Sequence, residues 1–105
     1  MANPLRGEVE IALGGETLTL RPTFGAIMEI EDRLGGIVPL ASRAAAGDFG
    51  LRDVAVIVRA CLNAADGGSR SLDEVGERIM AEGLANVTPA VSALLAGILS
   101  GHERR

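Results

Sequence analysis

The sequence of 105 residues contains few of the side chains on which most enzymes and metal sites depend. It has one cysteine, Cys61, and one histidine, His102. These two residues cannot close a tetrahedral zinc site, and a single cysteine excludes an internal disulfide. A catalytic thiol or imidazole needs a partner that tunes its pKa. We therefore expect Cys61 to be a buried structural thiol and His102 to be a solvated residue near the C-terminus.

Aromatic and basic residues are also scarce. The chain has no Trp, no Tyr and two Phe residues, while 48% of its residues are hydrophobic, so the predicted core is aliphatic. It has no lysine, and its arginines are scattered from Arg6 to Arg105 among acidic residues that bring the net charge to −4. Nucleic-acid-binding domains usually carry a basic patch or stripe. The composition therefore predicts that the protein does not bind nucleic acid.

Long hydrophobic runs are missing. The first six residues lack the apolar segment of a signal peptide. The longest apolar candidate, residues 51–65, is shorter than the roughly 20 residues that span a bilayer, and polar residues interrupt it: Arg52, Asp53, Arg59 and Asn63. We therefore expect a cytoplasmic protein that does not enter a membrane.

Acidic and glycine residues are present in patterns that could carry chemistry. Glu29 and Asp32 lie three residues apart, as do Glu74 and Glu77, and this spacing could hold a metal on a helix. A solvated helix face explains the same spacing more simply. The three Gly-Gly pairs, at 14–15, 35–36 and 67–68, lack the Gly-Lys-Ser/Thr that completes a phosphate-binding loop. The sequence thus predicts no catalytic residue, no cofactor, no metal and no enzymatic activity.

Residues 5–21 have the pattern of a β-hairpin. Apolar and polar residues alternate on both sides of Gly14-Gly15, and glycine supplies the positive φ that a two-residue turn needs. This loop would pair Val9 with Leu20 and Ile11 with Leu18, which makes one face of the hairpin apolar. A lone hairpin is marginally stable in water, so we expect this one to pack on helices.

The pattern of residues 23–46 predicts one helix followed by a short alanine-rich segment. Thr23 is the expected N-cap of the first helix, and Gly35-Gly36 ends it. Its expected inward stripe is Phe24, Ile27, Met28, Ile30 and Leu34. The alanine-rich segment from Leu40 to Ala46 follows, with Pro39 in its first turn.

The remaining residues predict three further helices. Residues 51–65 repeat apolar side chains every three or four positions, which indicates a central buried helix. Ser71 and Glu74 form a capping box before a helix that ends at Gly83, with Val75, Ile79 and Met80 facing inward. Thr88-Pro89 resembles the start of a last helix that ends at Gly101.

Taken together, the patterns predict a single domain, residues 1–105, of the α+β class. Its N-terminal β-hairpin, residues 5–21, would pack on a bundle of four or five α-helices formed by residues 23–101.

The first third of the chain resembles a known family. The resemblance lies in the segment Leu13 to Ala26 and in the Glu-Ile-Glu at 29–31. It is similar to the start of the gene transfer agent tail assembly chaperones, a branch of the phage tail chaperones. The family pattern is a hairpin, a turn like Leu-Arg-Pro-Thr, a Gly-Ala pair and an acidic helix before a Leu-Gly stop. The residues that fit this pattern are Arg21, Pro22, Thr23, Gly25, Ala26, Glu29, Glu31, Leu34 and Gly35.

This resemblance implies a non-enzymatic assembly factor. Tail chaperones bind the tape measure protein, keep it soluble and help tail tube subunits polymerise around it. Members of the family are also labelled tail tube or minor tail proteins, so the alternative is a structural tail component that stays in the particle. A tube protein usually needs a larger sheet than one hairpin. A regulatory or antitoxin-like module is a third hypothesis, and it would need a basic DNA-contacting element that the sequence lacks.

Several apolar residues lie outside the narrow stripes that the core requires, and we predict that they bind the partner. They are Ile37, Val38, Leu40, Val56 and Ile57. Exposed apolar patches usually mark interaction sites or self-association. Either the free protein self-associates, or a mobile segment near residues 37–50 covers the patch until the partner arrives. The alternative is that these residues complete the core.

Overall fold

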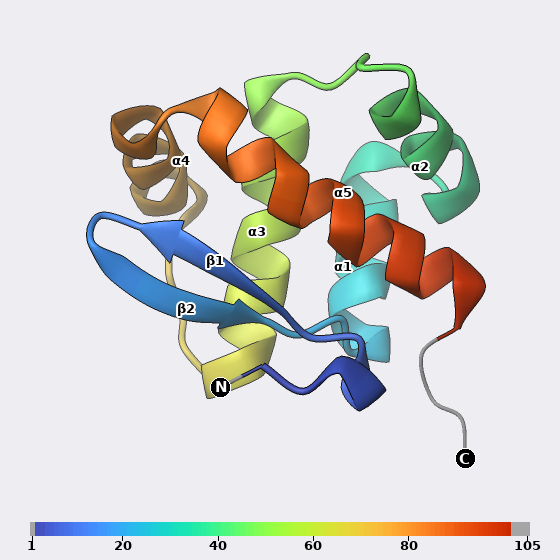
Figure 1. Cartoon of the computed structure of the whole chain (residues 1–105), viewed down its shortest axis with the longest axis horizontal. Coiled ribbons are helices and arrows are strands. Elements are labelled where there is room, and N and C mark those ends of the chain that lie inside the picture. Colours follow the sequence, from blue (N-terminus) through green and yellow to red (C-terminus); the bar gives the residue numbers. More distant parts are fainter. Residues whose placement is uncertain (1, 102–105) are drawn as a thin grey trace.

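The computed structural model of the chain describes residues 2–101 and contains one hairpin and five α-helices (Figure 1). A short 3-10 turn, Pro4–Arg6, precedes the strands β1 (Val9–Leu13) and β2 (Glu16–Leu20). The helices are α1 (Phe24–Leu34), α2 (Ile37–Ala45), α3 (Leu51–Asp66), α4 (Leu72–Glu82) and α5 (Leu84–Ser100). The predicted α+β class, with an N-terminal hairpin on a helical bundle, is confirmed.

The hairpin has the predicted register. Val9 pairs with Leu20 and Ile11 with Leu18 in an antiparallel ladder. Gly14 and Gly15 close the turn with φ values of 58° and 83°, which L side chains rarely adopt. The hairpin is shorter than expected at its start, because Pro4 and the Asn3 side chain, which accepts a hydrogen bond from the Leu5 N–H, favour the 3-10 turn. Strand pairing therefore begins at Val9.

Helix α3 forms the centre of the molecule. In Figure 1 the hairpin and α5 pass in front of α3, while α4 and α1 lie on opposite sides of it. The buried residues of α3 surround most of its circumference: Val54, Ala55, Val56, Ile57, Val58, Ala60, Cys61 and Leu62. The expectation of a central apolar helix is confirmed. Every buried side chain that contributes to the core is aliphatic or, at Cys61, a thiol.

Three residues predicted to face inward lie at the surface. The exposed fraction is 79% for Phe24, 42% for Met28 and 63% for Met80. Helical residues turn by about 100° each, and the buried side of α1 passes through Ala26 and Ile30. Phe24 and Met28 lie well away from that line. Met80 likewise lies a quarter-turn beyond Ile79, which is fully buried.

Two helices begin earlier than predicted. Helix α2 begins at Ile37, and Pro39 is tolerated there because N–H groups of the first turn have no intrahelical acceptor. Helix α5 begins at Leu84 and includes Pro89 in its interior. The Thr88 hydroxyl donates to the Leu84 carbonyl at 2.8 Å and does not act as an N-cap. The break between α4 and α5 is Gly83, whose φ is 102°.

No single helix among residues 2–101 has the length and apolar character needed to cross a membrane. The pair α4 and α5 reaches that length and composition only together, and it is bent by 116°.

Candidate partner-binding surfaces

The described residues contain no titratable group in the surroundings of a catalytic or metal-binding residue. Cys61 is fully buried, and burial, with a smaller contribution from the charge of Glu29, raises the pKa of its thiol to about 12. A thiol with this pKa is protonated at neutral pH and is a poor nucleophile. Within residues 2–101 no group of three or more His, Cys, Asp or Glu side chains could hold a metal ion. His102 lies outside the described residues.

One residue of each predicted carboxylate pair has a structural contact. Glu29 forms ion pairs with Arg59 of α3 and, at 4.0 Å, with Arg33 one turn along α1. The Ser71 hydroxyl accepts a hydrogen bond from the Glu74 N–H at 3.0 Å, which is the N-cap half of the predicted capping box. Glu29 therefore stabilises the packing of α1 on α3.

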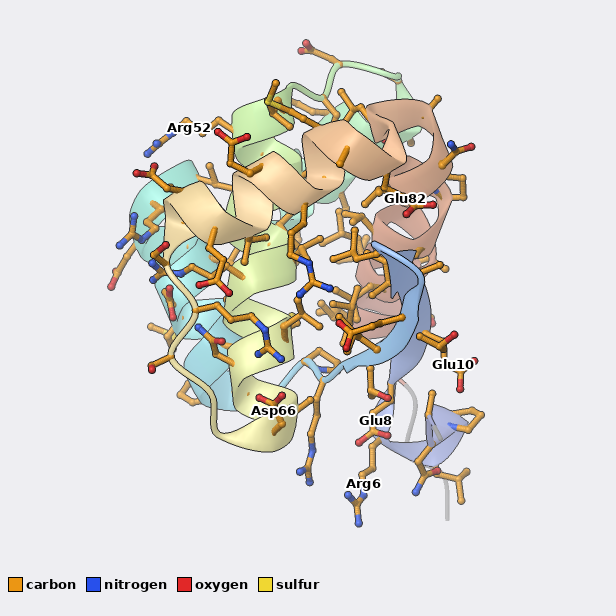
Figure 2. All side chains as sticks on the ribbon, turned by 90° about the vertical axis from the view of Figure 1, so that its left-hand side faces the viewer. Arg6, Glu8, Glu10, Arg52, Asp66 and Glu82 are labelled. Atoms are coloured by element: carbon orange, nitrogen blue, oxygen red, sulfur yellow. The ribbon has the colours of Figure 1, made fainter. Side chains whose placement is uncertain are left out.

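The hairpin is fastened to α4 at its turn. Arg78 of α4 donates to the Leu13 carbonyl at 3.2 Å and pairs with Glu16 at 2.6 Å. Glu82 accepts a hydrogen bond from the Gly14 N–H at 3.1 Å, and Figure 2 shows its carboxylate beside the hairpin. The turn is thus held by side chains of α4 that lie more than sixty residues away in the sequence.

The five residues predicted to bind a partner do not share one surface. Ile37, Leu40, Val56 and Ile57 are buried, and Val38 is 67% exposed. Ile37 and Leu40 face the core from α2, while Val56 and Ile57 are buried on α3. Binding through the four buried residues would require the elements that cover them to move. Their role in binding stays a prediction.

A hollow lies between the N-terminal half of α5 and the end of α2. It has a volume of about 640 Å³ and is lined by Ala44, Gly47, Phe49, Leu84, Ala85, Thr88, Pro89 and Ser92. A smaller hollow of about 210 Å³ shares Ala44 and Ser92 with it and continues to Leu99. The sequence pattern did not indicate this groove, because Leu84 and Ala85 precede Thr88, the predicted start of the last helix. The signal that could have revealed it is Gly83, which separates two apolar helical patterns.

A second groove, of about 340 Å³, lies between the N-terminal part of α3 and α4. Its apolar lining consists of Leu51, Ala55, Leu72, Gly76 and Met80. Its charged lining consists of Arg52 on α3 and of Asp73 and Glu77 on α4. Figure 2 shows α4 crossing in front of α3, with Arg52 projecting outward beside it. Apolar walls with charged edges are typical of surfaces that bind an amphipathic helix.

The groove contains the one arginine of residues 2–101 that forms no ion pair. Within residues 2–101, every arginine except Arg52 forms an ion pair with a carboxylate. Arg6, for example, lies 3.7 Å from Glu8, and both are labelled near the base of the hairpin in Figure 2. In the same part of the chain, Asp73 and Glu77 form no ion pair. The α3–α4 groove therefore combines an unpaired arginine with two unpaired carboxylates beside its apolar lining, whereas the unpaired carboxylates Glu10 and Asp48 lie outside it.

Comparison with known proteins places the chain in a family. Comparison with curated proteins and with solved structures gave no match. A family model described as "Phage tail tube protein, GTA-gp10" matches residues 6–101. This range includes both strands and all five helices. The match supports the tail-related family suggested by the resemblance of the first third, and the chain therefore belongs to the phage tail tube protein, GTA-gp10, family.

Proposed function

We propose that the protein is a non-enzymatic assembly factor of the tail, which binds the tape measure protein in the cytoplasm and assists tail tube assembly around it. The supporting observation is the small extent of its sheet. The described chain has two strands in one hairpin, and Arg78 and Glu82 of α4 hold the turn of that hairpin. A tube protein usually needs a larger sheet to build its ring, whereas a helical domain with open apolar grooves suits transient binding of a helix-prone partner.

The alternative is a structural tail component that remains in the particle. The description of the matching family as a tail tube protein favours it. Particle composition separates the two roles. We expect the protein to be absent, or present in far fewer copies than the tube subunit, when mature particles are analysed by quantitative mass spectrometry. An abundance equal to that of a ring subunit would establish the structural role.

Binding to the tape measure protein is tested by co-expression. We expect the tagged protein to retain the tape measure protein in the soluble fraction and to capture it in a pull-down. A tape measure protein that is equally soluble without its partner, and is not captured, would contradict the proposal. Light scattering over a dilution series, with and without a tape measure fragment, tests whether the free protein self-associates or instead has a mobile segment near residues 37–50 that covers the patch.

The absence of catalysis is tested by substitution. We expect His102→Ala and Cys61→Ala, made separately, to support normal tail assembly, because neither residue has the partners that catalysis requires. A variant that folds normally and yet abolishes assembly would contradict a non-enzymatic role.

A further inference from the structure

We propose that the α3–α4 groove binds an amphipathic helix that has an apolar stripe and a row of Lys or Arg residues along one edge of that stripe. This inference rests on the proposed function and deepens it, because it names the binding face and the chemistry of the partner segment. The α2–α5 hollow is larger, but its lining carries no charge that would select a partner.

The apolar floor of the groove has the dimensions of a short helix contact. Leu72, Gly76 and Met80 follow one another at four-residue steps along α4, which gives a row of about 12 Å. Leu51 and Ala55 of α3 form the opposite wall. Met80 is 63% exposed although it lies in this apolar lining. A row of this length can contact about two turns of a partner helix.

Gly76 keeps the floor of the groove open. Glycine in the interior of a helix is unfavourable relative to alanine, and a Cβ atom added at Gly76 would meet no atom within 4 Å. Neither the backbone nor the packing of the folded chain therefore requires a glycine at this position. A larger side chain would occupy the space into which a partner helix would pack.

The charges of the groove select a cationic partner over a second copy of the chain. Asp73 and Glu77 outnumber Arg52 in the lining, and in the described chain none of the three is ion-paired. If two copies met through this face, the excess negative charge of one groove would face that of the other, and the two would repel each other. A helix with Lys or Arg beside its apolar stripe would instead pair with Asp73 and Glu77, and such pairing weakens as salt increases.

The groove can be tested with two synthetic peptides of equal length. Both carry leucines at three- and four-residue steps, and one has lysines along the edge of the stripe where the other has glutamates. We expect the protein to bind the lysine peptide at least tenfold more tightly than the glutamate peptide, measured by calorimetry at low salt. The affinity for the lysine peptide should fall as salt is added.

Two variants with matched controls locate the binding site. Gly76→Leu fills the groove, and Gly97→Leu is its control, because Gly97 is also a helical glycine with no atom within 4 Å of an added Cβ. Glu77→Lys reverses a charge of the groove, and Asp32→Lys reverses an exposed charge on α1. We expect each groove variant to lose at least tenfold in affinity and each control to stay within twofold. All four variants should have the circular dichroism spectrum of the folded wild type.

The tape measure protein distinguishes failure of this inference from failure of the proposed function. If the wild type captures it and Gly76→Leu and Glu77→Lys capture it equally well, the groove assignment is overturned and the function stands. If the wild type captures no tape measure protein, the proposed function fails, and the peptide affinities alone decide whether the groove binds a cationic helix. A dimer of the free protein that Gly76→Leu dissociates would assign the groove to a second copy and overturn the inference.

Discussion

At the scale of single residues, Cys61 makes stability depend on pH in the alkaline range. Burial raises the pKa of its thiol from 9.0 to about 12. Above pH 9 the unfolded chain therefore loses a proton that the folded chain keeps, and stability falls as pH rises. The chain has no Lys and no Tyr that would titrate in the same range.

We therefore expect the free energy of unfolding to fall by about 1.4 kcal/mol per pH unit above pH 9. Urea unfolding at several pH values between 8 and 11 measures this slope. In Cys61→Ala the slope should disappear, although the variant is less stable at pH 7 because it loses buried volume. An equal slope in both proteins would mean that another group titrates on unfolding.

Asp53 has the opposite effect, in the acidic range. Its carboxylate accepts hydrogen bonds from Arg43, at 3.0 Å and 3.3 Å, and from the Gly50 N–H at 2.8 Å. The hydrogen bonds from Arg43, followed by the smaller effect of Gly50, lower the pKa of Asp53 below its ordinary value. As pH falls, the unfolded chain binds this proton before the folded chain does.

The contribution of Asp53 is thus complete above about pH 5 and is lost as pH falls through the unfolded value, about 3.9, toward the lower folded pKa. We expect Asp53→Asn to be less stable than the wild type at pH 7 and to lose less stability between pH 6 and 3. Asp66→Asn should change this profile less, because Asp66 is 54% exposed and solvent screens its pair with Arg70. Parallel pH profiles for the wild type and Asp53→Asn would refute this assignment.

At the scale of an element, helix α5 contains an interior proline, Pro89, that destabilises the helix. Pro89 has no N–H to donate to the Ala85 carbonyl, and an interior proline costs about 3 kcal/mol relative to alanine. Proline also restricts the unfolded chain, which offsets about 0.4–1 kcal/mol of that cost.

We expect Pro89→Ala to stabilise the protein by about 2 kcal/mol, which corresponds to a rise of about 10 °C in the thermal midpoint for a domain of this size. Differential scanning calorimetry measures the change. A lower midpoint would show that the proline ring, which lines the α2–α5 hollow, contributes packing that outweighs the missing hydrogen bond.

At the scale of the whole molecule, the hairpin and the helices share one core. Val58 is fully buried on α3, and α3 contacts β2, α1, α4 and α5. An isolated buried charge costs several kcal/mol or more, and a typical domain is stable by only about 5–15 kcal/mol.

We therefore expect Val58→Asp to abolish the folded state, visible as loss of helical circular dichroism and of any cooperative thermal transition. Arg52→Asp, at an exposed position in the first turn of the same helix, should remain folded. A folded Val58→Asp protein with an unchanged midpoint would contradict the central position of α3.

Local patterns determined the elements of this protein, because each depends on residues close together in the sequence. Alternation around Gly14-Gly15 predicted the hairpin register, and the three- and four-residue periodicity of residues 51–65 predicted α3. The same reasoning misplaced Phe24, Met28 and Met80, because an apolar residue beside a buried stripe faces inward only if another element covers it. It also misplaced the start of α5, since tertiary packing accommodates Pro89 inside the helix.

Which residues line the grooves depends on the tertiary structure and could not be predicted from the sequence. Arg52 lies on α3 and Glu77 on α4, and the sequence does not indicate that they line the same groove. Nor does it indicate that Arg78 and Glu82 reach the turn of the hairpin. Such contacts depend on the angles at which whole helices pack, and those angles result from the fit of many side chains at once. The sequence by itself determined the class of the fold, the composition of its core and the resemblance of its first third to a family. The surface available to a partner was determined by how the helices meet.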